Sequence, residues 1–322
     1  MNYYIGIDLG GTNIAAGVVN ENFEIVGRGK RKTGAGRDNA AILDDMAAAA
    51  REAVENAGLT PEDIASVGVG CPGSVNPYTG VIATSNNLRF SNLPMRKELA
   101  ERLGKSPIYL DNDANAAAYG EMIAGAGKGT KDFIAITLGT GVGGGVVVGG
   151  KMVVGSNCAG GEVGHTVMVM DGEPCTCGRK GCFEAYASAT ALIRQTKAAM
   201  NEHPESKMWE LVNGDIAATN GRTPFDGMRA GDATAAAVVD RYCEYVACGI
   251  TNMINIFQPE VLCVGGGISK EKETLLAPVR KYVEHFRYSK NAPRQTEIKT
   301  AELGNDAGII GAAFLFRLYE TR

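Results

Sequence analysis

The sequence contains no run of about 18 consecutive apolar residues, the length that a membrane-spanning helix needs. Its 322 residues also contain no basic cluster, and the net charge is −4. Nucleic acid is therefore not expected as a partner, because phosphate-binding surfaces depend on lysine and arginine. The first residues enter a strand pattern directly, without the features of a signal peptide. We therefore expect a cytoplasmic protein that associates with no membrane.

The chain also lacks the G-x-x-x-x-G-K-S/T pattern of P-loop enzymes. Glycine, in contrast, is abundant: its 43 residues gather in short loops after apolar runs, which suggests backbone brought close to a ligand. Two segments, 68–73 and 139–144, match G-x-G-x-x-G. A dinucleotide site requires a helix directly after these glycines, and the following residues predict none. Rossmann-type dinucleotide binding is therefore not expected.

Two segments share one pattern, an apolar strand, a turn rich in glycine and threonine, and a second strand. They cover residues 4–19 and 133–148. The repetition predicts two related α/β halves that face each other across a cleft, each opened by a phosphate-binding turn. We expect a small domain of residues 1–112, joined by a C-terminal helix at 307–322, and a large domain of residues 113–306.

Hydrophobic periodicity and turn residues predict the remaining elements. We expect strands at 64–70, 108–110 and 261–264, helices at 39–57, 93–103, 114–124 and 307–319, and a mainly helical segment at 185–256 that is interrupted at 213–232.

The turn after the first strand offers three groups that suit a phosphate. Gly10 and Gly11 can present backbone N–H groups, and Thr12 can donate a hydroxyl. Asp8 can hold the hydration shell of Mg²⁺. A β-hairpin turn with an aspartate by chance is the alternative, and the second turn in an equivalent place argues against it.

Four residues have the composition of a structural zinc site. His165, Cys175, Cys177 and Cys182 form H-x₉-C-x-C-x₄-C, which supplies one nitrogen and three thiolates. The alternative is a group of surface cysteines with a histidine nearby. Glu162 and Glu184 flank these ligands, so a metal-bound loop would hold both carboxylates in place for sugar hydroxyls; otherwise they are solvated glutamates.

The segment 111–113 places three polar residues between a strand and a helix. Asp113 can accept the proton of a sugar hydroxyl while that oxygen attacks phosphorus. Helix capping by Asp111, Asn112 or Asp113 is an equally good interpretation of the spacing.

Together these motifs resemble the ROK family (repressors, open reading frames and sugar kinases), its bacterial glucokinases in particular. Residues 8–12 resemble the first phosphate motif of the family and residues 138–145 the second. Residues 162–165 and 175–184 match its signature segment, and residues 264–268 resemble its adenosine-side motif. The resemblance covers nearly the whole chain.

The resemblance implies two actin-like ATPase (ribonuclease H-like) domains flanking a cleft, where ATP and a sugar meet. It implies Asp113 as the general base and His165 as a ligand of both zinc and sugar. The implied sugar contacts are Gly73, Asn86, Asn87, Asn112, Asp113, Glu162, His165 and Glu184. The implied contacts of ATP and Mg²⁺ are Asp8, Gly10, Gly11, Thr12, Asn13, Thr137, Gly139, Thr140, Gly141, Gly265, Gly266 and Gly267.

The chain departs from the family pattern at two places. Asn13 stands where many relatives carry lysine, so phosphate binding depends more on backbone groups and Mg²⁺. Residues 86–90 end in phenylalanine, where glucokinases often have tryptophan.

We expect an ATP-dependent hexokinase that converts glucose to glucose 6-phosphate. The alternatives are a kinase for N-acetylmannosamine, N-acetylglucosamine, allose or fructose, and a sugar-sensing repressor. The repressor is disfavoured because family repressors carry a helix-turn-helix domain before the first phosphate motif, and Asp8 stands close to the first residue. The resemblance also implies a homodimer or homotetramer.

Overall fold

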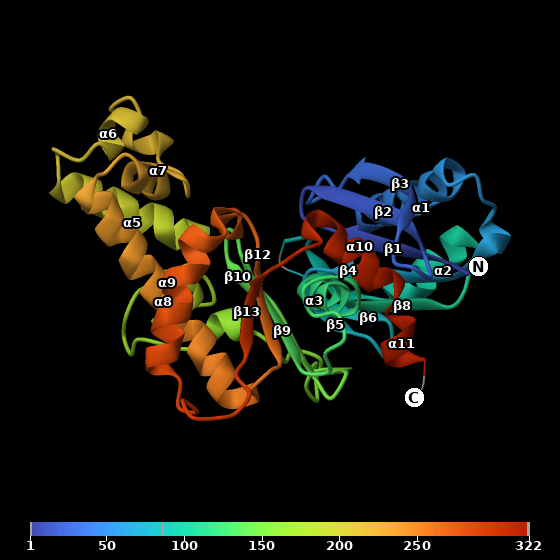
Figure 1. Cartoon of the computed structure of the whole chain (residues 1–322). Helices are drawn as coiled ribbons and strands as arrows, with labels where there is room; N and C mark the ends of the chain where they lie inside the picture. The colour runs from blue at the N-terminus through green and yellow to red at the C-terminus, as the bar shows by residue number, and fades with distance from the viewer. Residues whose placement is uncertain (1, 86, 321–322) are drawn as a thin grey trace. The chain divides into compact units, whose positions relative to one another are not determined.

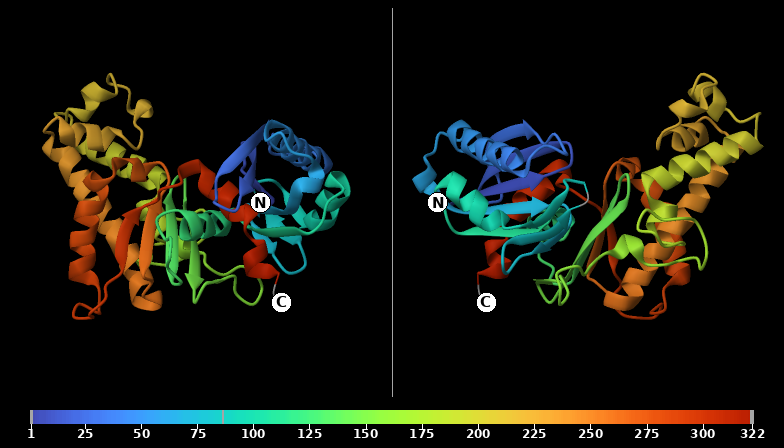
Figure 2. Two further views of the ribbon diagram at one scale, coloured as in Figure 1. Left: turned by 45° about the vertical axis from the view of Figure 1, so that its right-hand side comes forward. Right: turned by 180° about the vertical axis from the view of Figure 1, so that it is seen from behind.

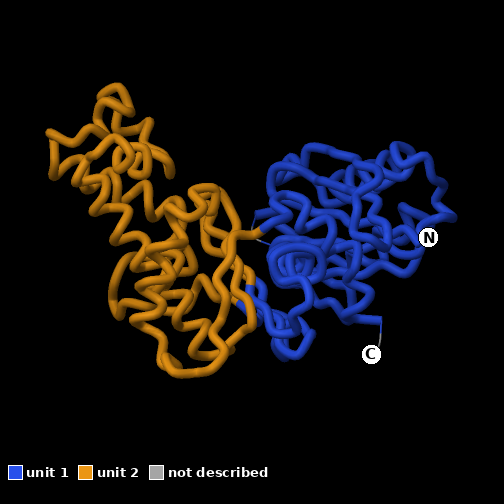
Figure 3. The backbone as a smooth tube through the Cα atoms, in the orientation of Figure 1, with its two compact units in different colours: residues 1–134, 145–161, 302–322 blue, residues 135–144, 162–301 orange. Residues whose placement is uncertain are grey.

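The computed structural model describes residues 2–85 and 87–320 (Figure 1). Its described residues form two compact units, coloured separately in Figure 3. Unit 1 comprises residues 1–134, 145–161 and 302–322, and unit 2 comprises residues 135–144 and 162–301. Within the described residues, no helix is both long enough and apolar enough to span a bilayer.

Unit 1 is built on a five-stranded sheet of order β3-β2-β1-β4-β8. Strands β1 and β2 form an antiparallel hairpin that β3 extends, whereas β4 and β8 run parallel to β1. The carboxyl ends of β1, β4 and β8 therefore lie at one edge of the sheet. The strands are β1 (Tyr3–Leu9), β2 (Asn13–Asn20), β3 (Ile25–Lys32), β4 (Ile64–Cys71) and β8 (Ile108–Asn112).

Helices cover both faces of this sheet (Figures 1 and 2). Alternate side chains of β1, including Ile5 and Ile7, join the apolar core that α1 (Asn39–Asn56) also lines. On the other face, a Cβ at Gly6 would stand 1.9 Å from the Ile309 carbonyl oxygen of α10 (Ala307–Ala313). Glycine at position 6 therefore lets α10 pack directly on the strand.

Helix α3 (Asp113–Ala124) belongs to unit 1 because it packs closely on α10. A Cβ at Gly311 would stand 1.7 Å from the Ala116 carbonyl oxygen, and one at Gly120 would stand 2.2 Å from that of Ala307. The compact division therefore follows residue 134, whereas we expected a boundary near residue 112. Whether the domains that move in solution follow the predicted limits stays a prediction.

The remaining elements of unit 1 are short. A three-stranded sheet contains β5 (Ser74–Asn76), β6 (Val81–Ser85) and β7 (Phe90–Leu93), and it is followed by α2 (Met95–Leu103). The expected single helix at 307–319 is wrong, because α10 ends at Ala313 and α11 covers Phe316–Tyr319. The Phe314 and Leu315 amides bond three residues back, which tightens the chain between the helices.

The second five-stranded sheet has the order β11-β10-β9-β12-β13, and the two units share its strands β9 and β10. Helices α5, α7 and α9 pack on α8, and α7 lies inside the segment 213–232, which we expected to be irregular. The strands are β9 (Phe133–Leu138), β10 (Val142–Val148), β11 (Lys151–Met152), β12 (Val261–Gly265) and β13 (Glu297–Thr300). The helices are α4 (Glu184–Ala187), α5 (Ala189–Glu202), α6 (Met208–Leu211), α7 (Thr223–Arg229), α8 (Ala233–Phe257) and α9 (Glu273–Phe286).

Candidate active site and metal centre

The turn between β1 and β2 is closed by its own backbone and braced by Thr33, which directly follows β3. The Gly10 amide donates to the Asn13 carbonyl at 3.0 Å. From the end of β3, the Thr33 hydroxyl donates to the Gly10 carbonyl at 2.6 Å, and the Thr33 amide donates to the Thr12 carbonyl at 3.0 Å. Gly11 and Thr12 are exposed. The predicted phosphate turn is thus fixed in shape while its tip is accessible.

A lysine that belongs to none of the sequence motifs lies beside this turn. Asn13 is paired with Lys32 in the β2–β3 register, and the Lys32 Nζ donates to the Asn13 Oδ1 at 3.1 Å. Lys32 is exposed and supplies a positive charge next to Asn13. The contact between Lys32 and Asn13 follows from the pairing of β2 with β3, so a prediction of that strand pairing would have been needed to find it.

Asp8 and Asp113 interact electrostatically within unit 1. Burial raises the pKa of Asp8 to about 6, and the negative charge of Asp113 adds to the shift. Gly308 of α10 gives the Asp8 carboxylate its space, since a Cβ there would stand 2.9 Å from it. Asp8 lies in β1 near its carboxyl end, and Asp113 directly follows β8. The parallel strands therefore bring the two predicted residues together.

The structure distinguishes the three polar residues at the β8–α3 junction. Asn112 caps α3, because its side-chain oxygen accepts from the Ala114 and Asn115 amides. Asp113 is the first residue of the helix, and its Oδ1 accepts from the Ala114 amide at 2.9 Å. Asp111 is only 1% exposed. Capping is thus chiefly the role of Asn112, and Asp113 stays the candidate base.

Gly73 lies beside Asn112, whose Nδ2 donates to the Gly73 carbonyl at 3.1 Å. Glycine is required there, because φ is 112° and a Cβ would stand 2.2 Å from the Thr84 carbonyl oxygen. Asn87 is exposed in the turn after β6. Asn86, the other member of that predicted pair, lies outside the described residues.

The four predicted metal ligands lie together in unit 2. Their donor atoms are all within 4.8 Å of one another. The Cys175 Sγ lies 3.6 Å from the His165 Nδ1, and the Cys177 Sγ lies 3.7 Å from the Cys182 Sγ. Tetrahedral zinc bonds imply about 3.5 Å between nitrogen and sulfur and about 3.8 Å between two sulfurs. The cluster therefore fits a zinc ion in both composition and spacing.

Glu184 connects this cluster to the turn between β9 and β10. Its Oε1 accepts from the Thr176 hydroxyl, and its Oε2 accepts from the Val142 amide, both at 3.0 Å. A Cβ at Gly141 would stand 2.3 Å from the Oε2, so glycine makes room for the carboxylate. Glu162 is exposed and precedes the short 3₁₀ turn Val163–His165.

The other predicted nucleotide residues of unit 2 gather at two neighbouring strand ends. Gly139 and Thr140 form the turn after β9, and their carbonyls accept from the Ala189 amide and the Thr190 hydroxyl. At the end of β12, a Cβ at Gly266 would stand 2.5 Å from the Leu138 carbonyl oxygen. The related positions are Thr137, which is half-buried in β9, Gly265, which ends β12, and Gly267, which is exposed.

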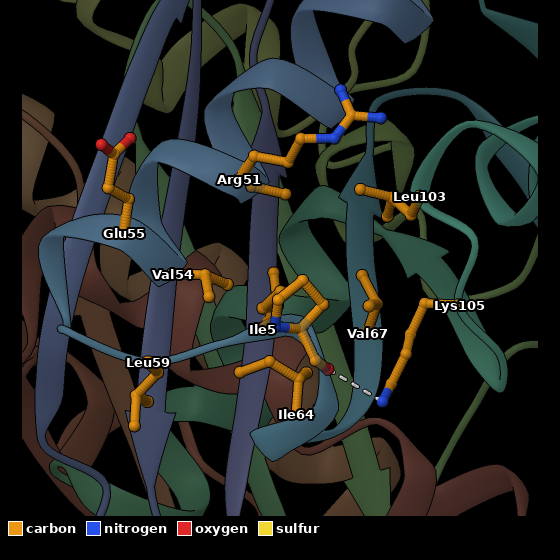
Figure 4. A pocket seen from close by; sticks show the side chains of 11 residues that line it. Ile5, Arg51, Val54, Glu55, Leu59, Ile64, Val67, Leu103 and Lys105 are labelled. Atoms are coloured by element: carbon orange, nitrogen blue, oxygen red, sulfur yellow. Dashed lines mark hydrogen bonds between the residues drawn. The ribbon is translucent and has the colours of Figure 1, made fainter.

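A separate apolar cavity of about 330 Å³ lies in unit 1, where β4 begins and α1 and α2 end (Figure 4). Ile5, Val54, Ile64 and Val67 line it, and the Lys105 Nζ donates to the Pro61 carbonyl beside it. None of the predicted site residues that the structure describes lines this cavity. Its apolar walls offer little to a sugar or phosphate, which need several polar partners.

Comparisons with known proteins agree with this arrangement. A glucokinase of Halalkalibacterium halodurans is 37% identical over 319 residues, which cover 99% of this chain and 96% of the relative. A glucokinase of Streptomyces coelicolor is 38% identical, with 98% of both chains covered. The crystal structure of a Streptomyces griseus ROK glucokinase with glucose and AMPPNP superposes with a TM-score of 0.81 at 36% identity, covering 98% of this chain and 99% of that one.

The fold is thus the actin-like ATPase fold of these sugar kinases. The ROK family model itself matches residues 4–318, almost the entire sequence. The chain therefore belongs to the ROK family.

Proposed function

We propose that this protein is an ATP-dependent hexokinase whose main reaction converts glucose to glucose 6-phosphate. The similarity to two glucokinases at 37% and 38% identity over nearly the full length favours glucose over other hexoses. Kinases for N-acetylmannosamine, N-acetylglucosamine, allose or fructose remain the alternative outcomes of the assay described below.

One observation carries the proposal: a carboxylate that follows β8 interacts with an aspartate at the end of β1. In the parallel strands Asp8 is paired with Gly70 and Gly70 with Asp111, two residues before Asp113, and the charge of Asp113 adds to the raised pKa of Asp8. Asp8 begins the proposed phosphate turn, and a base must stand near the phosphate to assist its transfer. Both residues lie in unit 1, so their interaction falls within one compact unit.

In the proposed reaction, Asp113 accepts the proton of a sugar hydroxyl while the hydroxyl oxygen attacks the γ-phosphorus of ATP. A bond forms between that oxygen and phosphorus, and the bond between phosphorus and the β–γ bridging oxygen breaks. ADP leaves with the electron pair, and the proton stays on Asp113 until solvent removes it. General-base assistance of this kind contributes about 10²- to 10⁴-fold to the rate.

Two of the proposed sugar contacts, Asn112 and Glu184, can form further hydrogen bonds. Asn112 uses one Nδ2 proton on Gly73, which leaves the second for a sugar hydroxyl. The Glu184 carboxylate accepts from Thr176 and Val142 and lies 3.6 Å from the Cys175 Sγ; a carboxylate can accept about four bonds, so it can still accept from a sugar hydroxyl. The other proposed contacts are Gly73, Asn86, Asn87, Asp113, Glu162 and His165.

The phosphates of ATP are assigned to the two glycine turns, and the adenosine to the loop after β12. In unit 1, Gly10, Gly11, Thr12 and Asn13 would bind phosphate, and Lys32 adds a positive charge to this turn. When bound, Mg²⁺ neutralises phosphate charge, and Asp8 would hold its hydration shell. The contributions of unit 2 come from Thr137, Gly139, Thr140, Gly141, Gly265, Gly266 and Gly267.

We assign a zinc ion to His165, Cys175, Cys177 and Cys182. A site closed by four protein ligands stabilises structure and takes no part in the chemistry. Its proposed effect is indirect: it would fix the loop that contains Thr176, whose hydroxyl donates to Glu184.

The test is a measurement of ADP release by the purified protein with Mg·ATP and a panel of hexoses. We expect the highest kcat/KM for glucose, with glucose 6-phosphate as product. An Asp113→Ala variant purified in parallel controls for contaminating kinases and should bind glucose without turnover. Absence of ADP release with every sugar would overturn the proposal, and a clear preference for another sugar would overturn the choice of glucose.

We further propose a homodimer or homotetramer, which the family resemblance supports. Light scattering at several protein concentrations measures the mass directly. A mass of 33.8 kDa at all concentrations would show a monomer and contradict this proposal.

A further inference from the structure

A buried carboxylate next to the proposed base receives hydrogen bonds from three directions. The Asp111 Oδ1 accepts from the Asn112 amide at 2.7 Å and from the Asn115 Nδ2 at 2.9 Å. The Asp111 Oδ2 accepts from the hydroxyl of Tyr319, which lies in α11. Asp111 and Asn115 are 1% and 6% exposed, so water competes little for these bonds.

These contacts join three elements at one point. Asp111 belongs to β8, Asn115 to the first turn of α3, and Tyr319 to α11, which is 208 residues away along the chain. The residues between Asp111 and Asn115 are the cap Asn112, the proposed base Asp113 and Ala114. The position and direction of the Asp113 carboxylate therefore depend on how firmly this junction is held.

We propose that Asp111, Asn115 and Tyr319 are positioning residues that fix the carboxylate of Asp113 for proton transfer. The inference depends on the proposed kinase function, and it adds Tyr319, which belongs to none of the sequence motifs. Because none of the three is assigned a contact with substrate, their loss should reduce kcat more than it changes KM.

Because Asp111 can ionise, its proposed role should appear in the pH dependence of kcat, which a purely structural role would not change. Burial raises the pKa of Asp111 to about 6, against the lowering effect of the hydrogen bonds from Tyr319, Asn115 and Asn112. Among the described residues, the thiol of Cys158 interacts with both members of this pair and the phenol of Tyr78 with Tyr319. An ionised Asp111 accepts all three bonds without needing an acceptor itself, whereas a protonated carboxyl adds a proton that competes for space with these donors.

The primary experiment compares the kcat and pH profile of Tyr319→Phe with the wild type. The variant removes one donor and leaves the ring in place, so the Asp111 pKa should rise further. We expect kcat at pH 7 to fall about tenfold, KM for glucose and ATP to change less than twofold, and the acid limb of the kcat profile to move to higher pH.

A matched control is Tyr282→Phe, which removes another hydroxyl that donates to an aspartate, Asp240 in unit 2. It should leave kcat and the pH profile unchanged. Asn115→Ala serves as the second test if Tyr319→Phe does not fold. It removes a different donor to Asp111 while alanine favours the helix, and it should shift kcat and the acid limb in the same direction.

The outcomes separate this inference from the kinase proposal. A wild type that phosphorylates no hexose refutes the proposed function itself. An active wild type whose Tyr319→Phe variant keeps kcat, changes only KM, or keeps its acid limb refutes the positioning role alone. An equal loss in Tyr282→Phe also refutes it, because the effect would then be unrelated to Asp111.

Discussion

Replacing Asp113 by asparagine should nearly abolish phosphoryl transfer and leave the folded structure intact. The side chain of Asp113 accepts one hydrogen bond from the Ala114 amide at 2.9 Å, and the asparagine oxygen can accept the same bond. The amide cannot act as a general base at neutral pH. Asp113→Asn therefore removes the proposed proton acceptor without removing the contact at the start of α3.

The expected change in stability is small because two effects oppose each other. Losing a negative charge in the first turn of α3 lowers the free energy of unfolding by about 0.3–1 kcal/mol. Removing the repulsion with Asp8 raises it. The pKa of Asp8 is raised from 3.8 to about 6, chiefly by burial, and Asp113 is the smaller of the two causes, so this gain is modest.

The kinetic effect is expected to be far larger than the thermodynamic one. Loss of the base should lower kcat about 10²- to 10⁴-fold. The KM for glucose should change by less than about threefold, since the site keeps its shape. A coupled assay of ADP release measures kcat, calorimetry measures glucose binding, and urea unfolding measures stability.

Asp215→Asn provides a matched control in unit 2. Asp215 also accepts a backbone amide at the start of a short helix, from Ala217 at 2.8 Å, and it belongs to no proposed site. It should leave kcat unchanged. If Asp113→Asn retained more than a tenth of wild-type kcat, the assignment of the base would be wrong. If its free energy of unfolding fell by several kcal/mol, the stability argument would be wrong.

Four further predictions address other parts of the molecule. Burial raises the pKa of Asp111 from 3.8 to about 6, so the folded state holds this proton more tightly than the unfolded chain does. The resulting contribution to stability is present at low pH and is lost as the pH rises through 6. Urea unfolding should therefore show the free energy of unfolding of wild type falling by about 1 kcal/mol relative to Asp111→Asn between pH 5 and pH 7.5. Elemental analysis should find one zinc per wild-type chain and less in Cys177→Ser, with a lower Tm in the variant; equal metal content would contradict the site. Gly141→Ala should displace the Glu184 carboxylate and raise the KM for glucose about tenfold in steady-state assays, whereas an unchanged KM would exclude that sugar contact. Lys32→Gln should raise the KM for ATP about two- to fivefold at low salt and less at high salt, and an effect independent of salt would contradict a charge contact.

Features set by nearby residues were predicted well from the sequence. The strand–turn–strand pattern at residues 4–19 is confirmed as β1 and β2, and the expected helix at 39–57 is confirmed as α1, which ends one residue earlier. The ligands His165 to Cys182 lie within one short segment, so their spacing alone predicted the cluster. In each case the contacts that determine the structure are local. The period of the hydrophobic residues or the spacing of the ligands therefore predicts them.

Features set by distant contacts could not be predicted. The hydrogen bond of Tyr319 with Asp111 joins residues 208 positions apart, and no pattern in either segment indicates it. The membership of α3 in unit 1 likewise depends on Gly311 meeting Ala116 across two helices of small residues. A glycine in a sequence suggests that another part of the chain packs closely against its backbone, but it does not indicate which part.

Helix α10 explains why the ends of the parallel strands in unit 1 can hold carboxylates so closely. Gly308 leaves space for Asp8, and Gly311 allows α3, with Asp113 at its start, to pack against the same helix. The chain then enters α11, where Tyr319 donates to Asp111. One continuous segment thus contacts the elements that carry the proposed base, its neighbour and the aspartate of the phosphate turn. The charges of Asp8 and Asp113 repel each other, so packing against this segment has to hold the elements that carry them in place.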